Sequence, residues 1–247
     1  PYDDNGIKIF DRDGFKLSDE IENRIEELAL SGGMNTEQIG SAKLGKAERI
    51  DDVRNHYFEF AKTAIGDLNL KGLKIVLDCA NGAAYDIGPW IFRELGAEVI
   101  TIGVEPDGLN INHLCGALHP DHVGRFVSSH RADAGIALDG DADRVIFTDA
   151  SGRVVDGDRI LAMCALDLKQ RRKLCHNTLV TTVMSNLGLQ RAMNSSGIRV
   201  ITTTVGDRNV IEQMKRGGYN LGGEKSGHLI FMDHATTGDG IISALQV

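Results

Sequence analysis

Residues 134–147 read AGIALDGDADRVIF, which places an acidic turn between two apolar runs. The apolar runs predict a buried strand on each side of the turn. Asp139, Asp141 and Asp143 alternate with small residues, so their carboxylates converge on one point when the loop curls. Converging carboxylates repel one another, and a divalent cation with oxygen ligands, Mg²⁺ above all, removes that penalty. Arg144 adds a fork able to hold a phosphate beside the metal.

The same residues also fit a plain acidic turn between two strands, because Asp and Gly are common in turns. Three acids in register, followed directly by Arg144, favour the metal site over that alternative. A calcium-binding EF-hand loop requires Gly after the third acid and Glu at the twelfth position. Arg144 and Ala150 occupy those places, so the sequence excludes an EF-hand.

Strand and helix patterns alternate on both sides of the acidic turn. The first series has predicted helices at 85–95 and 121–128 and predicted strands at 73–78, 97–102, 134–138, 145–149 and 153–155. The second series has predicted helices at 157–171, 187–194 and 207–216 and predicted strands at 179–183, 199–204 and 229–232. Such alternation is typical of sheets with helices on their faces. We therefore expect an α/β fold of consecutive domains, each with a mixed, mainly parallel sheet and helices on both faces.

Two helical patterns precede these domains. Residues 18–30 are amphipathic, with Ser18 as candidate N-cap and an apolar stripe made by Ile21, Ile25, Leu28 and Ala29. A second helix is predicted at 50–65, and the polar connector at 40–48 marks the first domain boundary. The chain begins without Met and stops inside a helical pattern at 241–247, so we expect an internal piece of a longer protein.

The composition is typical of a globular protein, with 42% hydrophobic and 25% charged residues. The formal net charge of −8 argues against a nucleic-acid or anionic-membrane partner, because both favour a basic face. The sequence shows no apolar run of membrane-spanning length and no signal peptide, which predicts a cytoplasmic location. The four cysteines form no CxxC pair and are expected to be reduced thiols.

Residues 222–228 read GGEKSGH and form a second polar cluster. In an extended loop, Glu224, Ser226 and His228 share one side, where a carboxylate and a hydroxyl can hold sugar hydroxyls. The imidazole there can contact a phosphate or carry a proton. A glycine-rich turn with a surface Glu–Lys pair explains the same residues, and both interpretations stay open. The residue order excludes a P-loop, which requires Gly-Lys followed by Ser or Thr.

A third cluster, at 205–208, follows a strand pattern and opens a helix. Asp207 is a candidate N-cap of that helix. Arg208 lies near the helix N-terminus, a place that favours a phosphate. Near the start of the chain, Asn5-Gly6 predicts a turn with Lys8 just beyond it. Composition alone makes Lys8 a surface lysine.

Taken together, these segments resemble the α-D-phosphohexomutase family over the length of the chain. Residues 1–8 are similar to the end of its serine-loop motif, 139–144 to its metal loop, 223–228 to its sugar-binding loop and 234–246 to the segment that follows. Within the family, VGDRNV at 205–210 and GLNINHLCGALHP at 108–120 resemble the bacterial branch that interconverts glucosamine 6-phosphate and glucosamine 1-phosphate for UDP-N-acetylglucosamine and cell-wall synthesis. Ala142 and Asn209 depart from the Gly and Tyr that are usual at those places.

The resemblance implies a four-domain phosphoprotein. Residues 1–40 would end domain 1, 41–152 would form domain 2 with the metal loop, and 153–247 would form a truncated domain 3 with the sugar-binding loop. Domain 4 and the phosphoserine, just upstream of Pro1, would be absent. The implied enzyme is an isomerase that transfers phosphoryl groups twice through glucosamine 1,6-bisphosphate, which is also its activator.

The resemblance also implies the roles of individual residues. One Mg²⁺ per active site would lie on Asp139, Asp141 and Asp143 and bind the serine phosphate. Lys8, Arg144 and His228 would be catalytic, whereas Glu224, Ser226, Asp207 and Arg208 would bind a phosphorylated amino sugar. The implied protein takes no nucleic-acid or membrane partner and allows for a homodimer, and the isolated chain would be inactive.

Three alternatives remain beside this interpretation. The first keeps the family but moves the chain to the phosphoglucomutase and phosphomannomutase branch. The second is a Mg²⁺ phosphatase of the haloacid-dehalogenase type, which the third Asp and Arg144 fit poorly. The third is a non-catalytic fragment that binds a metal ion and a sugar phosphate.

Overall fold

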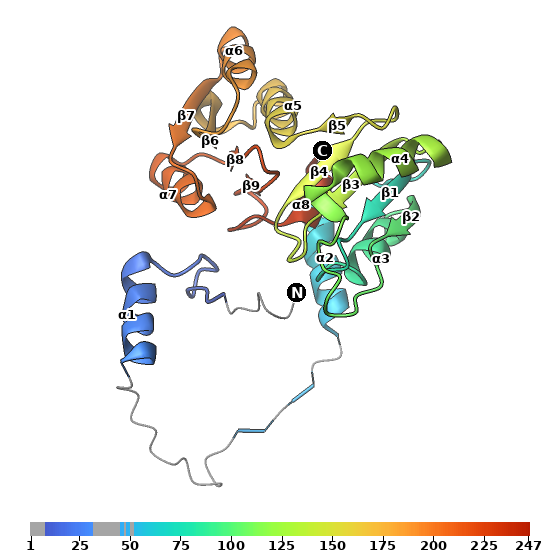
Figure 1. Ribbon diagram of the computed structural model, residues 1–247. Helices are drawn as coiled ribbons and strands as arrows, with labels where there is room; N and C mark the ends of the chain where they lie inside the picture. The colour runs from blue at the N-terminus through green and yellow to red at the C-terminus, as the bar shows by residue number, and fades with distance from the viewer. Residues whose placement is uncertain (1–7, 32–44, 47, 50–51) are drawn as a thin grey trace.

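A computed structural model describes residues 8–31, 45–46, 48–49 and 52–247 as two α/β units with an N-terminal segment beside them (Figure 1). The helices and strands that the sequence predicts from residue 52 onward are present, with ends that differ by a few residues. The fold class is therefore confirmed. The prediction of a helix at 50–65 corresponds to α2 (Val53–Ile65), whose first predicted residues lie outside the described part.

The first unit contains a five-stranded sheet in the order β2-β1-β3-β4-β5. Strand β1 lies parallel to β2 and β3, whereas β4 is antiparallel to both β3 and β5. Helix α4 (Pro120–His130) packs on one face and α3 (Ile87–Glu94) on the other. Because both faces are covered, the inner residues of the central strands are apolar, as in Ile75, Val76 and Leu77 of β1. The strands are β1 (Lys74–Asp78), β2 (Glu98–Ile102), β3 (Ala134–Leu138), β4 (Val145–Thr148) and β5 (Val154–Val155).

The second unit contains a four-stranded sheet in the order β7-β6-β8-β9. Strand β6 lies parallel to β7 and β8, and β9 is antiparallel to β8. Helix α7 (Asp207–Gly217) covers one face, and α5 (Gly157–Gln170) and α6 (Leu187–Ser195) cover the other. The strands are β6 (Thr178–Thr182), β7 (Arg199–Thr203), β8 (Leu221–Gly223) and β9 (Leu229–Phe231).

The two sheets share one plan. The order β2-β1-β3-β4 of the first matches β7-β6-β8-β9 of the second, and the last strand of each set runs antiparallel. The like architecture expected of the two units is thus present. The acidic turn at 139–144 joins β3 to β4, and the polar turn at 224–228 joins β8 to β9. The two turns therefore occupy equivalent connections of their sheets.

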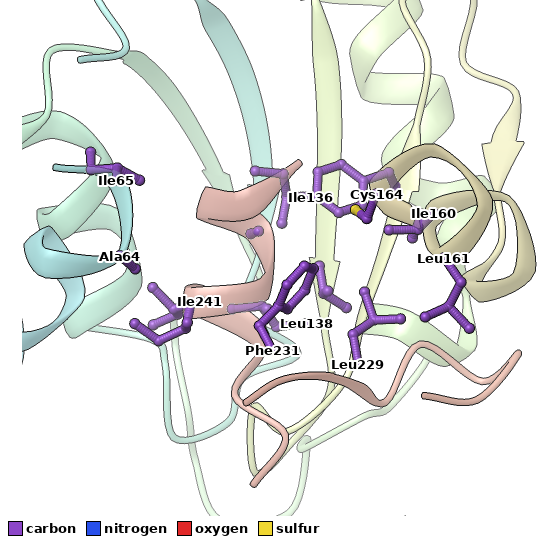
Figure 2. Packing of buried hydrophobic residues seen from close by; sticks show 14 of the residues in the cluster. Ala64, Ile65, Ile136, Leu138, Ile160, Leu161, Cys164, Leu229, Phe231 and Ile241 are labelled. Carbon is purple, nitrogen blue, oxygen red and sulfur yellow. The ribbon is translucent and has the colours of Figure 1, made fainter. Parts of the chain in front are cut away.

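A shared apolar core joins the units. Helix α8 (Gly240–Gln246) follows the second sheet but packs against α2, β3 and β4 of the first unit. Figure 2 shows Ile241 of α8 between Ala64 of α2 and Leu138 of β3. Asp239 caps α8 through the backbone N–H of Ile241, and it accepts a hydrogen bond of 2.7 Å from the hydroxyl of Tyr57 in α2. These contacts fix the orientation of the two turns toward one another.

The N-terminal segment carries helix α1 (Asp19–Leu30), which matches the helix predicted at 18–30. Ser18 stands at the N-cap position, but its side chain makes no capping hydrogen bond. An amphipathic stripe is expected to pack against something, yet Ile21, Ile25 and Leu28 are 40–49% exposed and no residue of α1 is buried. Within the described residues, the apolar stripe therefore has no cover.

Two local predictions need correction. Strand β8 was not predicted, because two of its three residues are glycines and its short length hides any alternation. The segment at 222–228 was expected to be an extended loop, but it begins inside β8 and then turns tightly at residues 225–227. The domain boundary at 152/153 stays a prediction, and the one at 40/41 lies outside the described residues.

The remaining expectations concern thiols and membranes. Cys79, Cys115 and Cys164 are buried, Cys175 is half-buried, and all four are free. Burial raises the pKa of the Cys164 thiol to about 12, which keeps it protonated.

Across the described residues, the helices are too short or too polar to cross a membrane.

Candidate active site

The acidic turn leaves the carboxyl end of β3 and brings three carboxylates together. One oxygen atom from each of Asp139, Asp141 and Asp143 lies within 4.8 Å of the others. Ala142 has a φ of +60°, in the left-handed region, which lets the turn close. The backbone N–H of Ala142 also donates to the carbonyl oxygen of Asp139 at 3.1 Å. The loop therefore curls as the alternating small residues predicted.

The three carboxylates lie in unequal environments. Burial and the negative charge of Asp143 raise the pKa of Asp139 to about 6. Burial acts against ionisation of Asp143 too, but His228 and Lys8 outweigh it and hold the pKa of Asp143 well below its usual range. Atom Oδ1 of Asp143 is buried without a hydrogen-bond partner among the described residues.

Two basic side chains flank the carboxylates. The ammonium group of Lys8 pairs with Asp141 and lies 3.3 Å from Oδ2 of Asp143. Burial opposes the charge of Lys8, but these carboxylates outweigh it and raise the Lys8 pKa. Nε of Arg144 lies 3.4 Å from Oδ2 of Asp139. Lys8 is therefore an exposed lysine, as composition alone suggested, and it also pairs with the carboxylate cluster.

The donor set fits a magnesium ion. The three groups are carboxylates, the hard oxygen ligands that Mg²⁺ prefers, and they converge without sulfur or nitrogen ligands in the cluster. The raised pKa of Asp139 points to negative charge that its surroundings do not compensate, and Oδ1 of Asp143 accepts no hydrogen bond among the described residues. A divalent cation among these oxygens would lower the pKa of Asp139 and give Oδ1 of Asp143 a ligand bond.

Loops from neighbouring strands press against the acidic turn. A Cβ added to Gly82 would lie 2.1 Å from the carbonyl oxygen of Gly140, so only glycine fits there. The N–H of Ala83 donates to the same oxygen at 2.8 Å. The buried Asp78 holds these loops by accepting from the backbone N–H groups of Ala80 and Gly116, both at 2.8 Å. The fold therefore fixes the backbone that carries the carboxylates.

The polar turn of the second unit lies against the acidic turn. Oε1 of Glu224 accepts a hydrogen bond of 3.0 Å from the N–H of Gly206, at the start of α7. The carbonyl oxygen of Gly227 accepts from the N–H of Val145, which directly follows the acidic turn, at 2.9 Å. The two equivalent connections thus meet across the boundary between the units.

His228 lies between two carboxylates. Its side chain is only 5% exposed, with Nδ1 at 3.7 Å from Oδ1 of Asp143 and Nε2 at 3.6 Å from Oδ2 of Asp207. Nε2 is buried without a hydrogen-bond partner among the described residues. An imidazole can accept or release a proton, and in this position a carboxylate faces each of its two nitrogen atoms.

A cleft of about 370 Å³ collects most of the predicted site residues. Asp143 and Arg144 contribute from the acidic turn, and the polar turn contributes its carboxylate, hydroxyl and imidazole. Asp139, Asp141 and Lys8 adjoin the cleft through the contacts described above. The start of α7 and the N-terminal segment complete the lining. All the residues that line the cleft are Lys16, Asp143, Arg144, Gly206, Asp207, Glu224, Ser226 and His228.

The third cluster differs from its prediction. Gly206, and not Asp207, is the N-cap of α7, and no side chain caps that helix. Asp207 instead pairs with Lys16, a residue that sequence reasoning missed because no motif or spacing distinguishes it. Arg208 does not line this cleft but a neighbouring hollow with Lys8 and Lys16, and it pairs with Asp19 and Glu22 of α1, at 2.7 Å from Oε2 of Glu22. A role for Arg208 in binding the substrate stays a prediction.

Comparison with known proteins agrees with this architecture. Residues 55–152 match the family model described as phosphoglucomutase/phosphomannomutase, alpha/beta/alpha domain II, and residues 156–247 match that of domain III. The chain belongs to the phosphoglucomutase/phosphomannomutase family. The resemblance noted in the sequence is thereby confirmed, and the two matched segments correspond to the two α/β units of this phosphohexomutase chain.

Curated relatives carry a more specific name. The chain is 60% identical over its whole length to the phosphoglucosamine mutase of Geotalea uraniireducens and 55% identical to that of Myxococcus xanthus. It spans about half the length of these relatives, 55% and 54%.

Solved structures show the same fold. A phosphoglucomutase/phosphomannomutase family protein from Burkholderia thailandensis has a TM-score of 0.74 at 25% identity, over 93% of this chain and 48% of that one. The N-acetylphosphoglucosamine mutase of Aspergillus fumigatus, solved with GlcNAc-6P and magnesium, has a TM-score of 0.60 over 81% of this chain and 47% of that one. At 18% identity, this second likeness shows the fold alone.

Proposed function

We propose that this chain forms the central part of a phosphoglucosamine mutase, an isomerase of the bacterial cytoplasm that interconverts glucosamine 6-phosphate and glucosamine 1-phosphate. The observation that carries the proposal is the meeting of the acidic turn and the polar turn at one cleft. The identity of 55–60% to proteins of that name supports the choice of amino sugars. The reaction would pass through a phosphoserine outside the described residues and a glucosamine 1,6-bisphosphate.

In each transfer, the bond from phosphorus to one oxygen breaks while the bond to another oxygen forms, and the attacking hydroxyl releases a proton. Lys8, whose raised pKa keeps it positive at neutral pH, would stabilise the phosphoryl charge and supply a proton to the leaving oxygen. Arg144 would hold phosphate oxygens. His228, between two carboxylates, is our candidate for accepting the hydroxyl proton.

The sugar would be held by the polar turn. The Glu224 carboxylate and the Ser226 hydroxyl would bind sugar hydroxyls, with Glu224 kept in place by Gly206. Asp139, Asp141 and Asp143 would hold the Mg²⁺, which supplies Lewis-acid neutralisation of the phosphoryl charge. Arg208 belongs to the α1 contact in this structure, so its role in binding the substrate stays a prediction. A homodimer stays a prediction.

The test is the specificity of the complete, serine-phosphorylated protein. We expect kcat/KM with Mg²⁺ to favour glucosamine 6-phosphate over glucose 6-phosphate and mannose 6-phosphate by about tenfold or more, which is about 1.4 kcal/mol of transition-state binding. A preference for either hexose phosphate would move the chain to the other branch of the family. Absence of turnover on all three sugars would overturn the proposed function.

A further inference from the structure

An ion pair inside the cleft links the N-terminal segment to the second unit. Lys16, which bridges to Phe10 in a short antiparallel contact, pairs with Asp207 at the start of α7. Both side chains are 22% exposed, and both line the cleft beside Glu224 and His228. The pair joins residues 191 positions apart, so it exists only in the folded chain.

The other two carboxylates that line the cleft, those of Glu224 and Asp143, already have a defined place in the two turns. Glu224 accepts a hydrogen bond from the backbone N–H of Gly206, and Asp143 belongs to the acidic turn. Asp207, like Asp143, lies beside the imidazole of His228 and the ammonium group of a lysine, but unlike Asp143 it stands outside the carboxylate triad of the acidic turn. Burial opposes its charge, but Lys16 and His228 outweigh this and lower the pKa of Asp207, so it is ionised at neutral pH.

A lysine ammonium group has the same chemistry as the protonated amine of a hexosamine. The position of Lys16 therefore marks a place where the cleft accepts a primary ammonium group against a carboxylate. A hexosamine phosphate is a zwitterion that carries both an ammonium group and a phosphate. It can exchange partners with the Lys16–Asp207 pair, its ammonium going to Asp207 and its phosphate to Lys16, without leaving either charge unpaired.

We propose that Asp207 is the residue that recognises the 2-ammonium group of the substrate, with Lys16 as its partner in the substrate-free chain. This inference rests on the proposed function. A hexose phosphate has a hydroxyl at the same carbon and can engage Lys16 only through its phosphate. That would leave Asp207 without its cationic partner in a half-buried site, which disfavours the hexose.

The test uses the complete mutase and the ratio of kcat/KM for glucosamine 6-phosphate to that for glucose 6-phosphate. We expect Asp207→Asn, which removes the charge but keeps the shape, to lower the ratio about tenfold. The matched control is Asp167→Asn on α5, an exposed carboxylate paired with Arg171, which leaves the ratio unchanged. A fall of less than threefold in the Asp207→Asn ratio overturns the inference.

Two further measurements keep the outcomes distinct. Asp207→Glu retains the charge, so we expect its kcat/KM ratio to stay higher than that of Asp207→Asn. Equal losses in both variants would show that the negative charge at this position does not recognise the amine. Thermal melting of each variant establishes that it is folded. Loss of turnover on glucosamine 6-phosphate by the unmodified mutase would be a failure of the proposed function, whereas normal turnover with an insensitive ratio would be a failure of this inference alone.

Discussion

The turn at 139–144 and the turn at 224–228 occupy equivalent connections of two like sheets, yet they are held differently. The acidic turn is pressed by loops in which Ala80, Asn81 and Asn112 adopt left-handed backbone, and Ala142 does so in the turn itself. In the polar turn, positive φ angles are confined to glycines, and the backbone N–H of Gly206 donates a hydrogen bond that fixes the carboxylate of Glu224.

The difference follows from what each turn holds. Three like charges repel one another, so their approach must be imposed by a backbone that surrounding loops support. A sugar site uses single hydrogen-bonding groups that do not repel, so one short turn and one anchoring contact are enough. Damage to the first turn is therefore expected to change metal binding and chemistry, and damage to the second to change mainly the use of the sugar.

The largest expected effect comes from Asp141→Asn in the complete enzyme. We expect kcat to fall by about a thousandfold, because one metal ligand and its charge are lost. The side chain of Asp141 is 54% exposed, so the melting temperature should change little. Asp67→Asn, an exposed carboxylate of the same unit, is the control and should leave kcat unchanged. A fall of less than tenfold in Asp141→Asn would remove the metal-site interpretation.

A smaller effect is expected from Glu224→Gln in the polar turn. The kcat/KM for the sugar phosphate should fall about thirtyfold, because a charge-assisted hydrogen bond to the sugar becomes a neutral one. Phosphorylation of the active-site serine by the sugar bisphosphate, followed by mass spectrometry, should be less affected. Equal damage to both steps would mean that Glu224 serves only to hold the turn to Gly206.

The support of the acidic turn is tested by Gly82→Ala. The added Cβ would meet the carbonyl oxygen of Gly140 at 2.1 Å, so the turn must shift. We expect a loss of about 2 kcal/mol of unfolding free energy, measured by urea denaturation, together with weaker Mg²⁺ binding. Gly45→Ala, where a Cβ meets nothing within 4 Å, is the matched control. Unchanged stability and Mg²⁺ affinity would show that the loops do not constrain the turn.

The smallest effect is a pH dependence. Because the pKa of Asp139 is about 6 in the metal-free chain, the group holds a proton below that pH and must release it to bind Mg²⁺. We expect the Mg²⁺ affinity, measured by calorimetry, to be constant above about pH 7 and to fall roughly tenfold per pH unit below about pH 6. A constant affinity from pH 7 to 5 would contradict the raised pKa of Asp139.

Some predictions succeeded because they rest on local patterns. The strand at 134–138 was placed correctly by its continuous apolar residues, and the acidic turn by its alternating small residues. Other outcomes depend on long-range contacts that the local pattern does not contain. Arg208 suits a phosphate at a helix start, but in the folded chain it also pairs with Glu22 of α1. Strand β8 exists because β6 and β9 offer hydrogen-bonding edges to a glycine-rich segment.

By itself, the sequence determined the order of helices and strands along the chain apart from β8, the class of the fold, and the positions of the acidic and polar turns, since these depend on neighbouring residues. Only the tertiary structure decided that the two turns occupy equivalent connections, meet through Val145 and Gly227, and share a cleft with Lys16 and Asp207. The physical reason is that pairing between distant segments is set by packing of the shared core, in which α8 joins the units, and not by local propensity.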